Sequence, residues 1–250
     1  YTVHAPLQAP AERIEERKAA GAPHATYAAM VEALDAEFGR VLAALKQRGL
    51  DENTVVIFTS DNGGYGPVTS TRHLRGFKGT LDEGGVRVPL LVRWPGKIRP
   101  GVSAEPMHHV DLMPTLVELA GASAPDAAID GVSLAPHWTQ KAALAKRTLG
   151  WHFPCYLEGK SDRFPNWRTI PGGSIVEHGR WKLVQYFGQR EDGTEWQELY
   201  DIANDPKEEF DLSAKYPDKV KSLKRELVTW RKTVGATMPT PKESKQQQSK

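Results

Sequence analysis

The chain has 250 residues, of which 39% are hydrophobic, and its 33 basic and 31 acidic side chains nearly cancel. This length can bury a substantial core in one large domain or in a large and a small one. The basic side chains form no stripe interleaved with aromatics, so nucleic acid is not an expected partner. The single Cys155 excludes an internal disulfide framework and a Cys-rich metal site. No apolar run approaches the roughly 20 residues of a membrane span.

The first half of the chain predicts alternating helices and strands. Apolar residues recur every three or four positions over 26–48, which predicts an amphipathic helix. Apolar strands follow at 55–60 and 88–94, with a Gly-rich polar loop at 63–85 between them. The segment "HHVDLMPTLVELAG" then predicts a helix that ends at Gly121. Because the strands are apolar on both faces, we expect an α/β sheet sandwiched between helices.

The pattern changes after about residue 145. "SIVEHGRWKLVQYF" predicts two strands around a His-Gly turn, "WQELYDI" predicts a third, and the apolar spacing over 218–234 predicts a helix. The tail at 239–250 is polar and of low complexity, which is typical of disorder. The chain is thus predicted to contain one α/β unit at 1–145 and a small antiparallel subdomain at 146–238.

The predicted strand in "VVIFTSDNGG" (55–64) ends in an acid, an amide and two glycines. Ligands of open α/β sheets bind outside the carboxyl ends of strands, which is where Asp61 and Asn62 lie. Carboxylate and amide oxygens suit Ca²⁺ or Mg²⁺ better than a soft metal. Asp, Asn and Gly are also the usual residues of turns. The spacing alone leaves both a metal site and a plain turn open.

The next loop, "RHLRGFKGTLDEGGVRVP" (72–89), places Lys78 between two glycines. Glycines let a backbone approach a ligand closely, and a lysine among them can contact an anionic oxygen as a point charge. A lysine in such a loop is otherwise a solvated turn residue. No sequence here matches the G-x-x-x-x-G-K-[ST] or G-x-G-x-x-G phosphate-binding patterns.

The two loop sequences, taken together, resemble the type I sulfatases, the arylsulfatase branch of the alkaline-phosphatase-like superfamily. "VHAPLQAP", "YAAMVEALD", "VDLMPTLVELAGA", "DGVSL" and "WKLVQYF…ELYDIANDP" extend the resemblance over nearly the whole chain in the right order. The resemblance implies the C-terminal part of an α/β/α sandwich, followed by a small antiparallel subdomain with a C-terminal helix.

The resemblance also implies roles for particular residues. Asp61 and Asn62 would be two ligands of a Ca²⁺ ion, with Mg²⁺ less suited, and Asp61 would also contact the hydroxyl of the nucleophile. Lys78 would bridge the sulfate and the leaving oxygen. His4 matches the histidine that binds the sulfate ester and protonates the departing alcohol. Such groups suit sulfate-ester hydrolysis, which needs charge neutralisation on oxygens and an acid for the alkoxide.

The family's nucleophile, a formylglycine made from a C/S-x-P-x-R motif, has no counterpart here. Cys155 lacks both the Pro and the Arg of that motif, and Ser123 has the Pro without the Arg. The motif is expected upstream of the residues given. We therefore expect the chain to be a C-terminal fragment that is inactive by itself.

Several other residues stay open between a binding and a packing role. Arg72 and His73 flank the Lys78 loop and could contact an anionic sugar, although a solvated loop face explains them equally well. Trp151 and His152 could line a substrate pocket where the two units join, although aromatics there commonly pack. The expected role of Glu83 is structural, holding the loop against the strand.

The predicted function is hydrolysis of sulfate monoesters, with a sulfated saccharide as one substrate class. The resemblance implies a periplasmic or extracellular location, and the oligomeric state is open. One alternative is a phosphatase or phosphodiesterase of the same superfamily, which the Lys78 loop argues against. Another is a non-catalytic, sulfatase-like sugar-binding protein.

Overall fold

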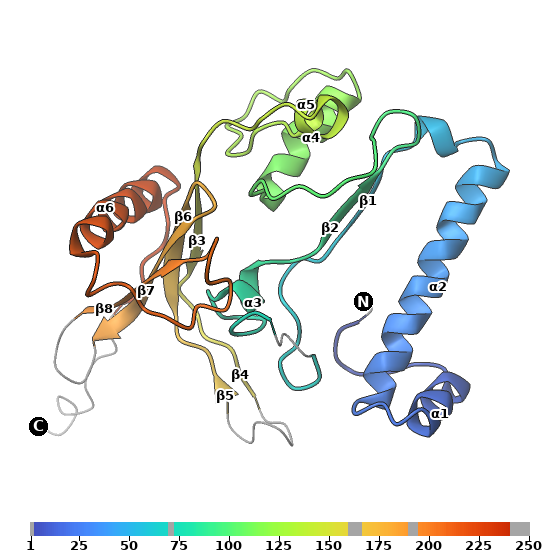
Figure 1. Cartoon of the computed structure of the whole chain (residues 1–250), viewed down its shortest axis with the longest axis horizontal. Helices are drawn as coiled ribbons and strands as arrows, with labels where there is room; N and C mark the ends of the chain where they lie inside the picture. The colour runs from blue at the N-terminus through green and yellow to red at the C-terminus, as the bar shows by residue number, and fades with distance from the viewer. Residues whose placement is uncertain (1–2, 70–72, 160–166, 190–194, 241–250) are drawn as a thin grey trace, which may run out of the picture.

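The structure is a computed structural model that describes residues 3–69, 73–159, 167–189 and 195–240. Figure 1 shows the N-terminal helices and a strand pair on one side, a sheet with a covering helix on the other, and a short helix between them. The helices are α1 (Ala11–Ala19), α2 (Ala25–Gln47), η1 (Asp51–Asn53), α3 (Glu83–Val86), η2 (His109–Asp111), α4 (Leu112–Leu119), α5 (Ala135–Gln140) and α6 (Pro217–Thr233). The strands are β1 (Val56–Thr59), β2 (Leu90–Arg93), β3 (Thr148–Phe153), β4 (Glu158–Gly159), β5 (Trp167–Arg168), β6 (Gly172–Glu177), β7 (Trp181–Gln189) and β8 (Glu195–Asp201).

Helix α2 lies within one residue of the amphipathic helix that the sequence predicts. It buries Ala29 and Met30, and Phe38 packs edge-on against Phe58 of β1 with ring centroids 5.3 Å apart. Gly49, at φ 67°, ends the helix in the left-handed conformation that glycine adopts without strain. The helix is therefore attached to the strand pair through one aromatic contact on its apolar face.

Strands β1 and β2 pair antiparallel, with Ile57 opposite Val92. The sequence predicts strands that are apolar on both faces, in a sheet sandwiched between helices. All four residues of β1 are half-buried, and Leu91 on β2 is 58% exposed. Apolar composition identified the strands correctly, but burial depends on which elements pack over them.

The second half forms a four-stranded antiparallel sheet in the order β3-β6-β7-β8. The predicted His-Gly turn joins β6 to β7, and both of its residues have positive φ, 53° for His178 and 68° for Gly179. That conformation matches the twist of a tight hairpin. The hairpin, β8 and α6 agree with the prediction, while β3 completes the sheet from a segment that the sequence pattern left unassigned.

The two faces of this sheet have different partners (Figure 1). Helix α6 covers one face and forms the main hydrophobic core with it, through Ile175, Leu183, Leu199, Val220, Leu223 and Leu227. The other face carries Trp151, Val176, Tyr200 and Ile202, and Lys182 on that face contacts Glu83 of α3. The sheet thus joins a hydrophobic core on one side to the loop that contains Lys78 on the other.

The structure is mixed α and β, as predicted. The boundary that the sequence places at residue 145 stays a prediction, and β3 begins three residues later, at Thr148. The predicted disordered tail lies outside the described residues from 241 onward. No helix in the described part of the chain is long and apolar enough to cross a membrane.

Candidate active site

The loop that follows β1 is bonded to the backbone of α3. Gly63 N donates to Gly85 O at 2.9 Å. A Cβ added to Gly63 would lie 1.9 Å from the carbonyl oxygen of Gly84. Only glycine allows this approach, because the clash would involve backbone that cannot turn away. The acid-amide-glycine sequence at 61–64 therefore packs closely against Gly84 and Gly85 of α3.

A second backbone bond brings Lys78 to the same loop. Lys78 N donates to Gly64 O at 3.0 Å. Gly79, which follows it, has φ 88°, a backbone conformation that residues with a side chain rarely adopt. The two motifs that the sequence singled out are thus in direct contact, and Lys78 lies where they meet.

His4 approaches Lys78 from the start of the chain. His4 Nε2 lies 2.8 Å from Lys78 Nζ, and His4 Nδ1 lies 2.8 Å from Ala5 O. Because a carbonyl oxygen only accepts, Nδ1 carries the hydrogen, and in the neutral ring Nε2 accepts from the Lys78 ammonium. The structure therefore brings together two predicted site residues that are 74 positions apart.

Asp61 and Asn62 sit at the tip of the loop, with Asp61 exposed and Asn62 half-buried. Within the described part of the chain, neither side chain has a hydrogen-bond or ion-pair partner. Their free oxygens are the donor type that Ca²⁺ prefers. Over the same residues, no group of three or more His, Cys, Asp or Glu side chains could hold a metal. The two residues fit a hard cation, but they supply only part of a coordination shell.

His109 is a neighbour of this loop that the sequence did not point out as functional. Its Nε2–H donates to Ser60 O, the carbonyl just before Asp61, at 2.8 Å. The partners are 49 positions apart, so no local pattern predicts the contact. His109 begins η2 and supports the backbone from which the Asp61 side chain projects.

A buried ion pair fixes η2 in place. The Asp111 carboxylate is fully buried, receives both Arg147 amino groups, and accepts from the backbone N–H groups of His108 and Val132. Burial alone would raise the pKa of Asp111, but Arg147 and the backbone donors hold it below its ordinary value. Burial also lowers the pKa of the His108 imidazole. The His109 contact therefore rests on a rigid support.

The remaining predicted residues lie elsewhere or outside the described residues. Arg72 is not among those described. His73 is exposed and lines a hollow of about 550 Å³ with residues of the segment that follows β8. Trp151 packs against the His108 ring at 5.1 Å. His152 lies on the α6 face of the sheet and its Nε2–H donates to Thr237 O at 2.8 Å. Substrate-binding roles for these residues stay predictions.

Comparisons with known proteins agree with the motifs. Residues 2–122 match the sulfatase family, and residues 77–233 match the family described as N-sulphoglucosamine sulphohydrolase, C-terminal. A sulfatase of Formosa agariphila is 40% identical over 209 residues, which cover 77% of this chain and 36% of the relative.

Solved structures give the same result. Ps i-CgsB in complex with k-i-k-neocarrahexaose matches with a TM-score of 0.73 at 27% identity, covering 92% of this chain and 48% of that one. BT4656 in complex with its substrate D-glucosamine-2-N,6-O-disulfate matches with a TM-score of 0.62 at 27% identity, covering 88% and 42%. The chain spans less than half the length of each of these relatives. It belongs to the type I sulfatases of the alkaline-phosphatase-like superfamily.

Proposed function

We propose that this chain forms part of an enzyme that hydrolyses sulfate monoesters, with sulfated saccharides as its substrate class. The observation that carries the proposal is the contact between His4 and Lys78 beside the loop of Asp61 and Asn62. These are the residues to which the sulfatase motifs assign anion binding and proton transfer. The matching structure with D-glucosamine-2-N,6-O-disulfate as its substrate supports a sulfated sugar.

Lys78 and His4 would divide the work at the leaving oxygen. The Lys78 ammonium would neutralise the negative charge that develops on the sulfate oxygens and the leaving group. His4 Nδ1–H is engaged by Ala5 O, so Nε2 is the atom that would give a proton to the departing alcohol. This step requires the ring to be protonated first, with Nε2–H donating to the leaving oxygen in place of accepting from Lys78. Because Nε2 already faces Lys78 Nζ, both groups would act on the same oxygen.

Asp61 and Asn62 would hold a Ca²⁺ ion through their side-chain oxygens, with Mg²⁺ less suited. A cation there would add positive charge next to the sulfate oxygens. The fit is supported by the side-chain oxygens of Asp61 and Asn62 at the loop tip, which have no partner among the residues that the structure describes. Further ligands and the formylglycine nucleophile would come from residues outside this chain, and the chain alone would be inactive.

The test uses a longer sulfatase that contains this chain, together with the 250-residue chain itself. Lys78→Ala and His4→Ala should each lower turnover of an aryl sulfate by on the order of 10²–10⁴. Thermal stability should change little, because both side chains are partly or fully exposed. Lys97→Ala, at an exposed turn, is the matched control and should retain the wild-type rate.

Three results would contradict this assignment. Wild-type turnover in either site variant would remove that residue from the reaction. Turnover of the aryl sulfate by the 250-residue chain alone would show that the nucleophile lies within it. Faster turnover of an aryl phosphate than of the aryl sulfate would favour the phosphatase alternative.

A further inference from the structure

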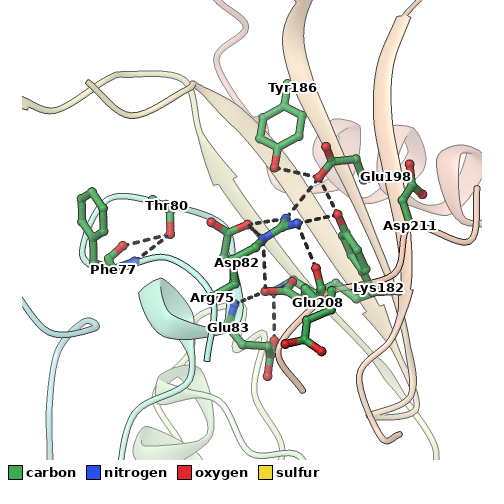
Figure 2. Close-up of polar contacts among 12 residues, drawn as sticks. Arg75, Phe77, Thr80, Asp82, Glu83, Lys182, Tyr186, Glu198, Glu208 and Asp211 are labelled. Carbon is green, nitrogen blue, oxygen red and sulfur yellow. Dashed lines mark hydrogen bonds and ion pairs between the residues drawn. The ribbon is translucent and has the colours of Figure 1, made fainter. Parts of the chain in front are cut away.

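A charged cluster with a buried centre lies beside the loop of Phe77 and Thr80 (Figure 2), the loop that also contains Lys78. Its centre is Lys182 on β7, whose side chain has no exposed surface. Lys182 Nζ lies 2.9 Å from Glu83 Oε1 and 3.0 Å from Glu208 Oε1. Glu208 Oε2 accepts from Glu83 N at 2.8 Å, so the first residue of α3 is held through both its side chain and its backbone.

Arg75 makes a second set of contacts with the same face of the sheet. Its Nη2 lies 2.7 Å from Asp82 Oδ1 and 3.1 Å from Glu198 Oε2 on β8. Its Nη1 donates to Tyr200 Oη at 2.6 Å and to Glu208 O at 3.1 Å. Figure 2 shows Arg75 reaching from the loop into this group of acceptors. Arg75 therefore joins the loop to β8 and to the segment that follows it.

The cluster contains more acid than base. Two cations, the fully buried Lys182 and the partly exposed Arg75, face four carboxylates, Asp82, Glu83, Glu198 and Glu208. The exposed Arg87 also reaches Glu83, at 3.7 Å. Burial raises the pKa of Glu208, and Lys182 opposes that rise. Such a buried network adds little net stability over an apolar replacement, but it fixes one arrangement because removing one partner leaves buried charge uncompensated.

The two anchors lie on either side of Lys78, Arg75 three residues before it and Glu83 five residues after it. They are also joined to each other, since Gly84 N donates to Arg75 O at 2.6 Å. The anchored segment bonds in turn to the loop at 61–64 through the two backbone contacts described above. A continuous series of hydrogen bonds and ion pairs thus connects the sheet to the Lys78 loop and to the Asp61 loop.

We propose that Glu83, Lys182 and Glu208 form a positioning triad, through which the C-terminal sheet sets the position of Lys78 and of the Asp61 loop. The catalytic part of this inference depends on the proposed function, whereas the mechanical coupling does not. Among the described residues, none of the three forms a hydrogen bond or ion pair with the side chain of His4, Asp61 or Lys78. The sheet acts on the site only through the loop that it holds.

The first test measures backbone hydrogen exchange in the 250-residue chain. The Glu83→Gln, Lys182→Met, Glu208→Gln triple variant removes all three charges and leaves no buried charge without a partner. The amides of Gly63, Lys78 and Gly84 should exchange faster by on the order of tenfold, because local opening becomes easier. Exchange in α6, on the far side of the sheet, should stay at the wild-type rate.

The matched control is Lys219→Met, which breaks an ion pair of the same sheet. Lys219 Nζ lies 2.9 Å from Glu177 Oε2, where α6 meets β6. This variant should leave exchange at 61–64 and 76–86 unchanged. The proposal is overturned if the triple variant keeps wild-type exchange at the site, or if α6 and the site loosen together. A triple variant that fails to fold overturns it as well.

The second test uses the longer enzyme and distinguishes this inference from the proposed function. The triple variant should lower kcat by on the order of 10²-fold, because misplacing Lys78 by about 1 Å is enough for such a loss. KM should change only a few-fold, as expected when stabilisation of the transition state is lost. The single Lys182→Arg variant keeps the buried positive charge, so its kcat should lie closer to the wild-type value than that of the triple variant. A triple variant with faster exchange at the site and a normal kcat would refute the catalytic consequence. If the wild-type enzyme does not hydrolyse sulfate esters but the triple variant still exchanges faster at the site, only the proposed function is refuted.

Discussion

The two halves of the molecule are held together by different means. Among the described residues up to 93, the buried hydrophobic side chains are Ala29, Met30 and Leu81. The C-terminal sheet and α6 instead share a continuous hydrophobic core. The candidate site lies on the lightly buried half. Its geometry therefore depends on backbone bonds and on the charged cluster that joins it to the well-packed half.

The largest expected effect comes from the core of the C-terminal sheet. Leu223 on α6 is fully buried, so Leu223→Ala should lower the free energy of unfolding by about 2–5 kcal/mol. Leu91→Ala on β2 should change it by about 0.5 kcal/mol or less, because Leu91 is 58% exposed. Denaturant unfolding of both variants measures the difference. Equal losses would show that the two halves do not differ in packing.

A smaller effect is expected where the two site motifs meet. Gly63→Ala places a Cβ against the Gly84 carbonyl, and the forced shift should destabilise the chain by about 1–3 kcal/mol. Gly39→Ala is the control, because nothing lies within 4 Å of the added Cβ in α2. That change should stabilise the chain by about 0.5–1 kcal/mol, the difference between Gly and Ala inside a helix. Thermal or denaturant unfolding that gave both changes the same sign would contradict the close packing of the loops.

The smallest effect concerns ion pairs between an exposed arginine and a less exposed aspartate, which should differ little between the halves. A hydrogen bond from Arg180 lowers the pKa of Asp201 below 3.8. A lowered pKa means that the stabilisation is present above pH 3.8 and is lost as the pH falls through the lowered value. Asp201→Asn should remove about 1 kcal/mol or less at neutral pH.

The measurement is the free energy of unfolding of Asp201→Asn and wild type between neutral and acidic pH. Their difference should shrink as the pH falls. Asp51 is the counterpart in the N-terminal half, where Arg93 lowers its pKa in the same way, so Asp51→Asn should show the same trend. A difference that grows on acidification would mean that the sign of the Asp201 shift is wrong.

Much of the fold followed from local patterns. The helix at 26–48, the His-Gly hairpin and the C-terminal helix were predicted because their apolar spacing and turn residues act over a few positions. The strand pair was located from its apolar composition, but its partial exposure among the described residues was not foreseen, because strand composition does not state what covers the strand. Glu83 was expected to be structural, and it is, but its partner is Lys182 on β7, 99 positions away. No pattern along the chain encodes that pairing.

The sequence by itself determined the kinds of chemistry available, namely an acid and amide after a strand, a lysine between glycines and a histidine near the start. It also determined the family, because two specific loop motifs occur in the right order. Only the tertiary structure decided that His4 reaches Lys78, that the two loops share backbone bonds, and that Arg75 binds Glu198 and Tyr200 of the sheet. Residue types are local properties of the chain, whereas these contacts join segments that lie apart along it and exist only in the folded chain.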